Sequence, residues 1–357
     1  MKSVLVLEDG TYFPGEAFGE AGETVGEVIF NTSMTGYQEI ITDPSYRGQI
    51  VAMTYPLVGN CGFNQYDNES SKSHVQGFIV KELSDTPTNW RFEITPDEYF
   101  KKSGIVGIKG IDTRTLAQRL RDKGSMYGII STESGNIDIL LERLMKKKQE
   151  KRNLVAEVTT KAPIHKPGNG KRVVVIDFGV KSSIIESLEK NSCDIYILPA
   201  TSSAMEIFDH KPDGILLSNG PGNPAELPSI KATIQELIGK KPILGIGLGF
   251  QLLGLALGGK TSKLKLGHHG CNYPVKDYKT GKCHITSQSH NYVLENNFGD
   301  DVVVTQTNIN DNTVEGLRHK QYPLIGVQYH PQTISEDDTS YVFYDFYKMI
   351  DEYSKSI

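Results

Sequence analysis

The sequence is poor in the features that mark secreted, nucleic-acid-binding and membrane-inserted proteins. Its 357 residues include only four cysteines, which are too widely spaced for a disulfide framework: Cys61, Cys193, Cys271 and Cys283. The 38 basic and 43 acidic side chains give a formal net charge of -5, so there is no electrostatic reason to expect a nucleic-acid partner. The first apolar run, Val4 to Leu7, is too short for a secretory signal and is followed by Glu8 and Asp9. We therefore expect a cytoplasmic protein.

One apolar stretch is long enough to be compared with a membrane span. Residues 242–259 are 18 long, and Gln251 is their only polar side chain. A spanning helix needs about 20 apolar residues, so the length is borderline. Six of the eighteen are glycine, and these gather around positions 245–249 as in a turn. This pattern favours a buried strand, turn and helix, and we expect no membrane association.

The length favours two domains, and the predicted pattern of secondary structure changes near residues 163–170. Residues 1–150 predict a β-rich domain, with strands at 3–7, 24–31, 49–54 and 75–80 and helices at 113–123 and 138–148. Asp112 is expected to cap the first of these helices. Residues 151–170, rich in Pro, Gly and polar residues toward their end, are predicted to be a linker.

Residues 171–357 alternate between predicted strands and helices. The strands are expected at 172–176, 194–198, 214–217 and 243–246, the helices at 181–188, 229–238 and 251–257, and a final helix at 341–350. Such alternation predicts an α/β domain with a mostly parallel sheet flanked by helices. Ligands of such sheets bind beyond the carboxyl ends of the strands, which places the glycine-rich turns 218–224 and 245–249 in the expected site.

The segment from Leu244 to Gln251 has the spacing of a nucleophile elbow. In this device a strand, a tight Gly-x-X-x-Gly turn and a helix lift one side chain above the sheet, where the helix N-terminus favours an anionic nucleophile. The elbow position here is Gly247, which has no side chain. Farther along, His330 follows a predicted strand and precedes Gln332 by two positions, an arrangement suited to a general base and its orienting partner.

Together these segments resemble the class I glutamine amidotransferase family. In that family the elbow carries cysteine and a later His-Pro-Glu completes a Cys-His-Glu triad. The segment Ser218 to Pro224 resembles the family's oxyanion and glutamine loop. The N-terminal segments 34–46, 54–60 and 110–114, with 177–181 and 267–270, resemble the small subunit of carbamoyl-phosphate synthetase. By this resemblance the glutamine contacts are expected from Ser45, Gly220, Gly222, Leu248, Gln251, Ser289, Asn291 and Tyr292.

The resemblance also implies a division of labour. Small subunits of this family hydrolyse glutamine through a cysteine thioester, and ammonia passes to a large subunit that uses ATP and bicarbonate to make carbamoyl phosphate for pyrimidines and arginine. A large subunit is therefore the expected partner. ATP and Mg belong to that partner, and no cofactor or metal is expected on this chain.

Four departures from the family pattern concern the glutaminase site. Gly247 replaces the cysteine, Gln332 replaces the triad glutamate, Phe250 replaces a histidine, and Ser289 begins a segment that is usually Asn-His-Gly. Without a nucleophile no covalent intermediate can form, so the sequence predicts a degenerate amidotransferase with lost or impaired glutamine hydrolysis.

Alternatives to this interpretation remain. Cys271, beside two histidines, could be a relocated nucleophile, and one engineered or misread position could explain Gly247 alone. A zinc site is a further alternative, with the ligand types present in His268, His269, Cys271, Cys283 and His284. At the level of function, the chain could be a synthetase subunit that supports ammonia-dependent synthesis, a regulatory or glutamine-binding protein not required for synthesis, or a working glutaminase with unorthodox residues.

Overall fold

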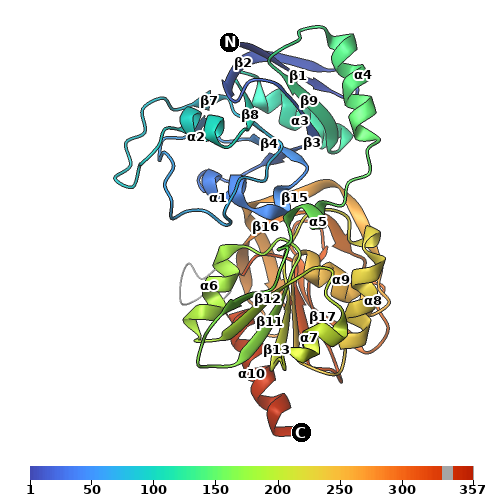
Figure 1. Ribbon diagram of the computed structural model, residues 1–357. Helices are drawn as coiled ribbons and strands as arrows, with labels where there is room; N and C mark the ends of the chain where they lie inside the picture. The colour runs from blue at the N-terminus through green and yellow to red at the C-terminus, as the bar shows by residue number, and fades with distance from the viewer. Residues whose placement is uncertain (332–340, 357) are drawn as a thin grey trace. The chain divides into compact units, whose positions relative to one another are not determined.

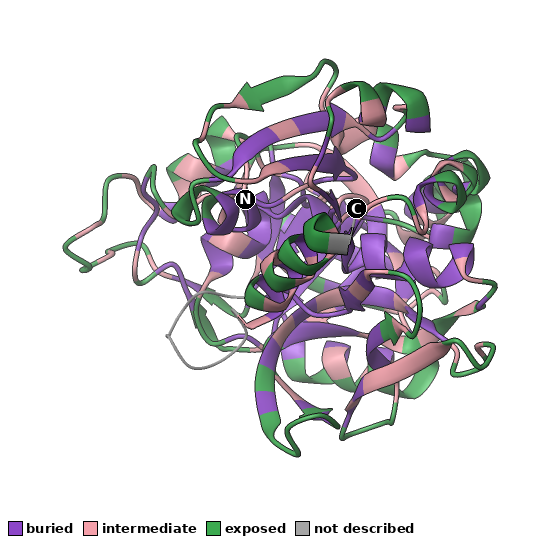
Figure 2. Ribbon diagram, turned by 90° about the horizontal axis from the view of Figure 1, so that it is seen from below, coloured by how far each residue is buried: buried purple, intermediate pink, exposed green. Residues whose placement is uncertain are grey.

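A computed structural model describes residues 1–331 and 341–356 (Figure 1). The chain forms two compact units. The first comprises Met1–Asn153 and Lys265–Gly270, and the second comprises Leu154–Leu264 and Cys271–Ile357. In both, buried residues concentrate on the strands, and exposed residues on the loops and the outer turns of the helices (Figure 2).

The first unit is built on a closed barrel whose strands run in the order β1-β2-β8-β6-β4-β3-β9. Closure matters because a barrel leaves no unpaired strand edge. The pairs β3–β4, β4–β6 and β6–β8 are parallel, and the others are antiparallel. The barrel strands are β1 (Lys2–Leu7), β2 (Tyr12–Gly19), β3 (Glu23–Asn31), β4 (Gln49–Met53), β6 (Gly77–Ile79), β8 (Val106–Lys109) and β9 (Met126–Ser131).

Short helices and a small ribbon accompany the barrel. They are α1 (Tyr37–Thr42), the 3-10 helix η1 (Pro44–Tyr46), α2 (Pro96–Lys102), α3 (Thr113–Lys123), α4 (Ile137–Lys148) and the parallel pair β5 (Leu57–Val58) and β7 (Glu82–Leu83). The predicted cap of α3 is confirmed, because an Asp112 carboxylate oxygen accepts a hydrogen bond from the backbone N–H of Thr115 at 3.0 Å.

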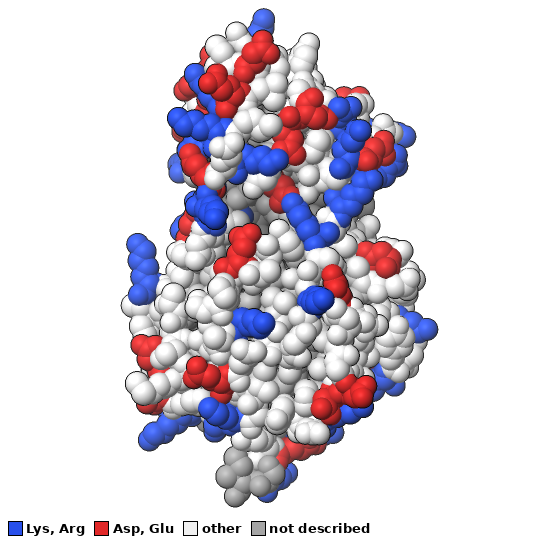
Figure 3. All heavy atoms as spheres, turned by 90° about the vertical axis from the view of Figure 1, so that its right-hand side faces the viewer, with Lys and Arg blue, Asp and Glu red and all other residues white. Residues whose placement is uncertain are grey.

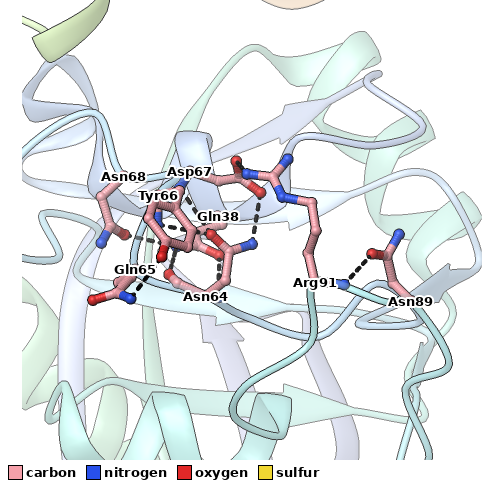
Figure 4. Close-up of polar contacts among 8 residues, drawn as sticks. All are labelled: Gln38, Asn64, Gln65, Tyr66, Asp67, Asn68, Asn89 and Arg91. Carbon is pink, nitrogen blue, oxygen red and sulfur yellow. Dashed lines mark hydrogen bonds and ion pairs between the residues drawn. The ribbon is translucent and has the colours of Figure 1, made fainter.

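A polar network fastens the long loop that follows β5 (Figure 4). The buried side chain of Gln38, on α1, accepts from the backbone N–H of Asn64 at 3.1 Å and donates to the Asn68 side chain at 2.8 Å. Asn64 in turn donates to Asp67 at 2.7 Å, and Arg91 pairs with the same carboxylate. Gln38 belongs to segment 34–46, so part of that segment's pattern serves to hold this loop.

The second unit contains a ten-stranded sheet in the order β10-β12-β11-β13-β14-β19-β18-β17-β15-β16. Strands β12, β11, β13, β14 and β19 are mutually parallel, and antiparallel strands extend the sheet on both sides. The strands are β10 (Ile164–Lys166), β11 (Arg172–Asp177), β12 (Asp194–Pro199), β13 (Gly214–Leu217), β14 (Ile243–Ile246), β15 (Thr261–Asp277), β16 (Cys283–Leu294), β17 (Val302–Asn308), β18 (Val314–His319) and β19 (Leu324–Val327).

Helices cover both faces of this sheet (Figure 1). Alternate residues of β11 show the division. Val174 and Ile176 lie in the core shared with α7, α8 and α9, whereas Val173 and Val175 lie in the core shared with α6 and α10. The helices are α5 (Leu154–Val158), α6 (Ser182–Lys190), α7 (Ala204–Asp209), η2 (Pro224–Glu226), α8 (Pro228–Leu237), α9 (Leu248–Ala256) and α10 (Tyr341–Ser356). The predicted α/β fold with a β-rich first domain is confirmed.

The structure departs from the predicted boundaries in two places. The stretch 151–170, predicted as a linker, contains α5 and β10, and β10 pairs antiparallel with β12. Residues Lys265–Gly270, within the long strand β15, belong to the first unit, where the N–H of Thr32 donates to the carbonyl of His269 at 3.1 Å. This contact joins residues more than 200 positions apart, so local sequence composition could not predict it.

The apolar stretch 242–259 forms β14, a turn and α9, as the glycine pattern predicted. Every residue of α9 is buried. Among the residues that the structure describes, no helix is long and apolar enough to cross a membrane. On the face drawn in Figure 3, positive and negative side chains lie interspersed.

Candidate active site

The strand, turn and helix predicted for the elbow are present at β14, Gly247 and α9. Gly247 has φ 57° and ψ -113°, a conformation that side chains rarely tolerate. Its N–H donates to the carbonyl of Val327 at 2.9 Å, and its own carbonyl accepts from Gln251 N–H at 3.1 Å. A Cβ at Gly249 would lie 2.2 Å from the Leu217 carbonyl oxygen, so glycine is needed there for close packing.

The space for a side chain at the elbow is intact. A Cβ built on Gly247 would lie 3.4 Å from Asn219 Cβ and 3.8 Å from the Gln328 carbonyl oxygen, both ordinary contacts. The nucleophile is therefore missing from a turn that retains the elbow's backbone conformation, which glycine adopts without strain, and its room for a side chain.

The loop after β13 is held mainly by its own packing. The Ser218 hydroxyl accepts from Phe178 N–H at 2.9 Å and donates to the Asn219 carbonyl at 2.8 Å. A Cβ at Gly220 would lie 2.2 Å from the Phe178 carbonyl oxygen, which explains that glycine without a ligand. Gly222 adopts φ 94° with more open surroundings. The glutamine contacts expected at Gly220 and Gly222 remain predictions.

His330 follows β19 and stands beside β16. Its N–H donates to the Ser287 carbonyl at 3.0 Å, which forms an isolated bridge between the two segments. Its Nε2 lies 2.8 Å from the Ser289 hydroxyl. The structure thus brings together His330 and Ser289, two of the predicted site residues. Gln332 lies outside the described residues.

The buried side chain of Gln251 ties α9 to the neighbouring strands. Its amide nitrogen donates to the Tyr292 carbonyl at 2.6 Å and to the Gln328 side chain at 3.0 Å. Gln251, Leu248 and Asn291 are buried, and Tyr292 is partly buried. Their contacts with glutamine stay predictions, as does that of Ser45, which lies in the first unit and is buried in η1.

A tyrosine pair supports the segment immediately before His330. The hydroxyl groups of Tyr329 and Tyr341 lie 3.0 Å apart, and the second donates to Asp277 at 3.4 Å. Burial raises the pKa of Tyr329 well above its ordinary value and that of Tyr341 to about 12. Both phenols are therefore neutral near pH 7 and act as hydrogen-bonding groups.

Phe250, which replaces a histidine of the family pattern, is a core residue, and an effect of this replacement on the glutaminase centre stays a prediction. Its ring is fully buried in the core formed with α8. It packs over Gly326 of β19, where an added Cβ would lie 2.9 Å from Phe250 Cδ2. The aromatic ring and the glycine are complementary in shape, and this was not evident from their separation in the sequence.

This packing gives a testable expectation. We expect Gly326→Ala to lower the free energy of unfolding by about 1–3 kcal/mol, because the added methyl group overpacks the core. The loss should shrink when Gly326→Ala is combined with Phe250→Leu, since the smaller side chain makes room. Urea denaturation of the four proteins measures the coupling, and strictly additive effects would contradict the proposed contact.

The geometry of the second unit bears on one form of the zinc alternative, in which Cys271 and Cys283 are both ligands. Where β15 turns into β16, the N–H of Asp277 donates to the carbonyl of Lys282, and the Thr286 hydroxyl donates to the carbonyl of Tyr273. This register sets Cys283 opposite residue 276. Cys271 is five residues from that point, about 16 Å along the strand, so the two exposed cysteines cannot bind one zinc ion. Cys271 as a relocated nucleophile is untested.

Comparison with known proteins agrees with the architecture. The family model for the carbamoyl-phosphate synthase small chain, CPSase domain, matches residues 5–130, and that for class-I glutamine amidotransferases matches residues 174–349. The chain is 48% identical to a carbamoyl phosphate synthase small chain of Listeria monocytogenes, over 98% of this chain and 97% of that protein. It is 48% identical to the small chain of Bacillus caldolyticus (99% and 98%) and 46% identical to the pyrimidine-specific small chain of Bacillus subtilis (99% and 98%).

Proposed function

The chain belongs to the family of carbamoyl-phosphate synthase small chains, and from this we propose that it acts as such a subunit without hydrolysing glutamine itself. It pairs with a large chain that makes carbamoyl phosphate, and the nitrogen comes from ammonia. The name of the Bacillus subtilis relative favours the pyrimidine pathway. ATP and Mg act on the large chain.

The observation that carries this proposal is the elbow without a side chain. Gly247 retains the positive-φ conformation of the turn, yet it offers neither a thiolate to attack a carboxamide nor an atom to hold an acyl group. His330, the predicted base, is hydrogen-bonded to Ser289. Thioester chemistry at the elbow position is therefore impossible in this chain, whatever the fit of glutamine.

The likeness across both family models supports the partner role. Other class I amidotransferases would share only the second unit, whereas the match over residues 5–130 is specific to carbamoyl-phosphate synthase small chains. Glutamine binding alone would not require the first unit, so its presence favours a role as a synthetase subunit.

Complex formation tests this part of the proposal. We expect the chain, co-expressed with its large chain, to co-elute from a size-exclusion column in a stable 1:1 ratio of the two chains. A control with an intact small chain from the same family fixes the elution volume of a true complex. Separate elution at micromolar concentration would favour a regulatory or glutamine-binding protein that synthesis does not require.

A further inference from the structure

The contact between Ser289 and His330 joins the two groups that serine hydrolases use for covalent catalysis. The hydroxyl oxygen lies 2.8 Å from Nε2, within the range in which an imidazole takes a proton from an attacking hydroxyl. With the imidazole neutral and its proton on Nδ1, the serine donates and Nε2 accepts. No such role follows from the family pattern, in which Ser289 stands in a glutamine-contacting segment.

The backbone holds this pair in place. The bridge between Ser287 and His330 sets the register of the histidine against β16 two residues from Ser289. On the opposite face of β16, His290 Nε2 lies 2.6 Å from the Gln288 side-chain oxygen, and both residues are buried. The Ser287–His330 bridge thus sets the register between the two segments that carry the nucleophile and the base, and catalysis requires such alignment.

Ser289 lies on the accessible face of the strand. Along β16 the odd-numbered residues from Cys283 to Ser289 are exposed or half-buried, while the even-numbered residues from His284 to His290 are buried. Ser289 is thus half-buried, as a residue that meets a small acyl donor must be at least in part, and His330, its hydrogen-bonding partner, is buried.

We propose that Ser289 is a nucleophile, activated by His330, that accepts the acyl group of activated carboxylic esters. The hydroxyl oxygen attacks the ester carbonyl carbon while its proton passes to Nε2. The tetrahedral intermediate collapses and the C–O bond to the leaving group breaks. An alkoxide leaving group takes the proton from Nε2, whereas a stable anion such as p-nitrophenolate departs unprotonated and Nε2 loses its proton to solvent. The neutral imidazole then deprotonates a water molecule that attacks the acyl-serine, the bond between Oγ and the acyl carbon breaks, Oγ takes the proton back from Nε2, and the carboxylic acid leaves.

The substrate class follows from the chemistry of the pair. Gln332, at the position of the family's glutamate, is neutral, and loss of the comparable carboxylate charge in a serine triad lowers the rate about 10⁴-fold. Esters with good leaving groups tolerate this loss, because their leaving group needs little protonation. Glutamine must release ammonia, a far poorer leaving group, so this activity is distinct from the missing glutaminase.

The test uses p-nitrophenyl acetate with the full-length chain alone. We expect a burst of p-nitrophenol followed by slow turnover, and a 42 Da increase in mass on the peptide that contains Ser289. Ser289→Ala should abolish the burst, and His330→Ala should lower the acylation rate about 100-fold or more. Ser202→Ala, which removes a half-buried serine elsewhere in the second unit, should behave like the natural chain.

Two further measurements separate chemistry from misfolding. Each variant is first compared with the natural chain by its thermal unfolding midpoint. Ser289→Cys then keeps a nucleophile beside the base, and we expect it to retain the burst, with the acetyl group now on residue 289. A burst of equal size in folded Ser289→Ala, or acetylation confined to other residues, would overturn the proposal.

Discussion

Combined with its large chain, this protein is expected to support carbamoyl phosphate synthesis from ammonium but not from glutamine. Removal of the nucleophile from a catalytic triad lowers the rate by about 10⁴–10⁶-fold in comparable hydrolases. Glutamine can therefore supply nitrogen only at a rate far below that of ammonium. The elbow geometry supports this expectation, because Gly247 has no side chain and, within residues 1–331 and 341–356, the atoms nearest to a Cβ built there belong to Asn219 and to the Gln328 carbonyl.

The measurement is carbamoyl phosphate formed with ATP and bicarbonate, with either glutamine or ammonium as the nitrogen donor. A complex of the same large chain with an intact small chain is the control, and it should use both donors. Comparable synthesis from glutamine would mean that another residue attacks the carboxamide, with Cys271 the first to replace. Co-elution without synthesis from either donor would point to a regulatory subunit.

The second expectation concerns the return of the missing side chain. We expect Gly247→Cys to lower the thermal unfolding midpoint and to leave glutaminase activity about 10⁴-fold below that of an intact family member. The backbone at φ 57° strains any side chain, at a cost of about 1–3 kcal/mol. The side chain has room, because the nearest contact of its Cβ would be 3.4 Å. Activity stays low because His330 is hydrogen-bonded to Ser289 and because Gln332 carries no charge to stabilise the imidazolium.

Gly247→Ala is the matched control for the effect on stability, since it adds the same strained Cβ without a thiol. The two variants should unfold at similar temperatures, and both below the natural chain. Glutamate release from glutamine, measured for each, isolates the contribution of the sulfur. Full glutaminase activity in the single Gly247→Cys variant would show that the remaining departures do not matter.

The structure also indicates which further substitutions belong in an attempt at restoration. Ser289→Asn restores the family residue in the glutamine segment, and Gln332→Glu restores that in the triad. The first change also removes the hydroxyl that is the present partner of His330. Phe250→His does not belong with them, because the aromatic ring lies in the hydrophobic core against Gly326. There it would bury a polar ring in an apolar environment.

Several elements were predictable because their signals are local. Strands β13 and β14 and helix α3 begin and end at the predicted residues, since apolar runs and an Asp cap mark them within a few positions. The elbow at Gly247 was also predicted, because its glycine spacing reflects the close approach of α9 to the Leu217 carbonyl. The family, too, followed from short motifs spread over the whole chain.

Other features depend on residues that only the folded chain brings together. The closure of the barrel and the place of Lys265–Gly270 in the first unit arise from pairing between distant segments. The packing of Phe250 against Gly326 was not predicted, because the two residues are 76 positions apart in the sequence.

By itself, then, the sequence determined the family, the fold class and the absence of an elbow nucleophile, because each depends on residue types and on their spacing over a few positions. The tertiary structure alone decided that Gly247 keeps the elbow's backbone conformation and its room for a side chain, that Phe250 is core, and that His330 lies against Ser289. These are matters of distance between segments, and distance between segments is set by packing and not by any local pattern.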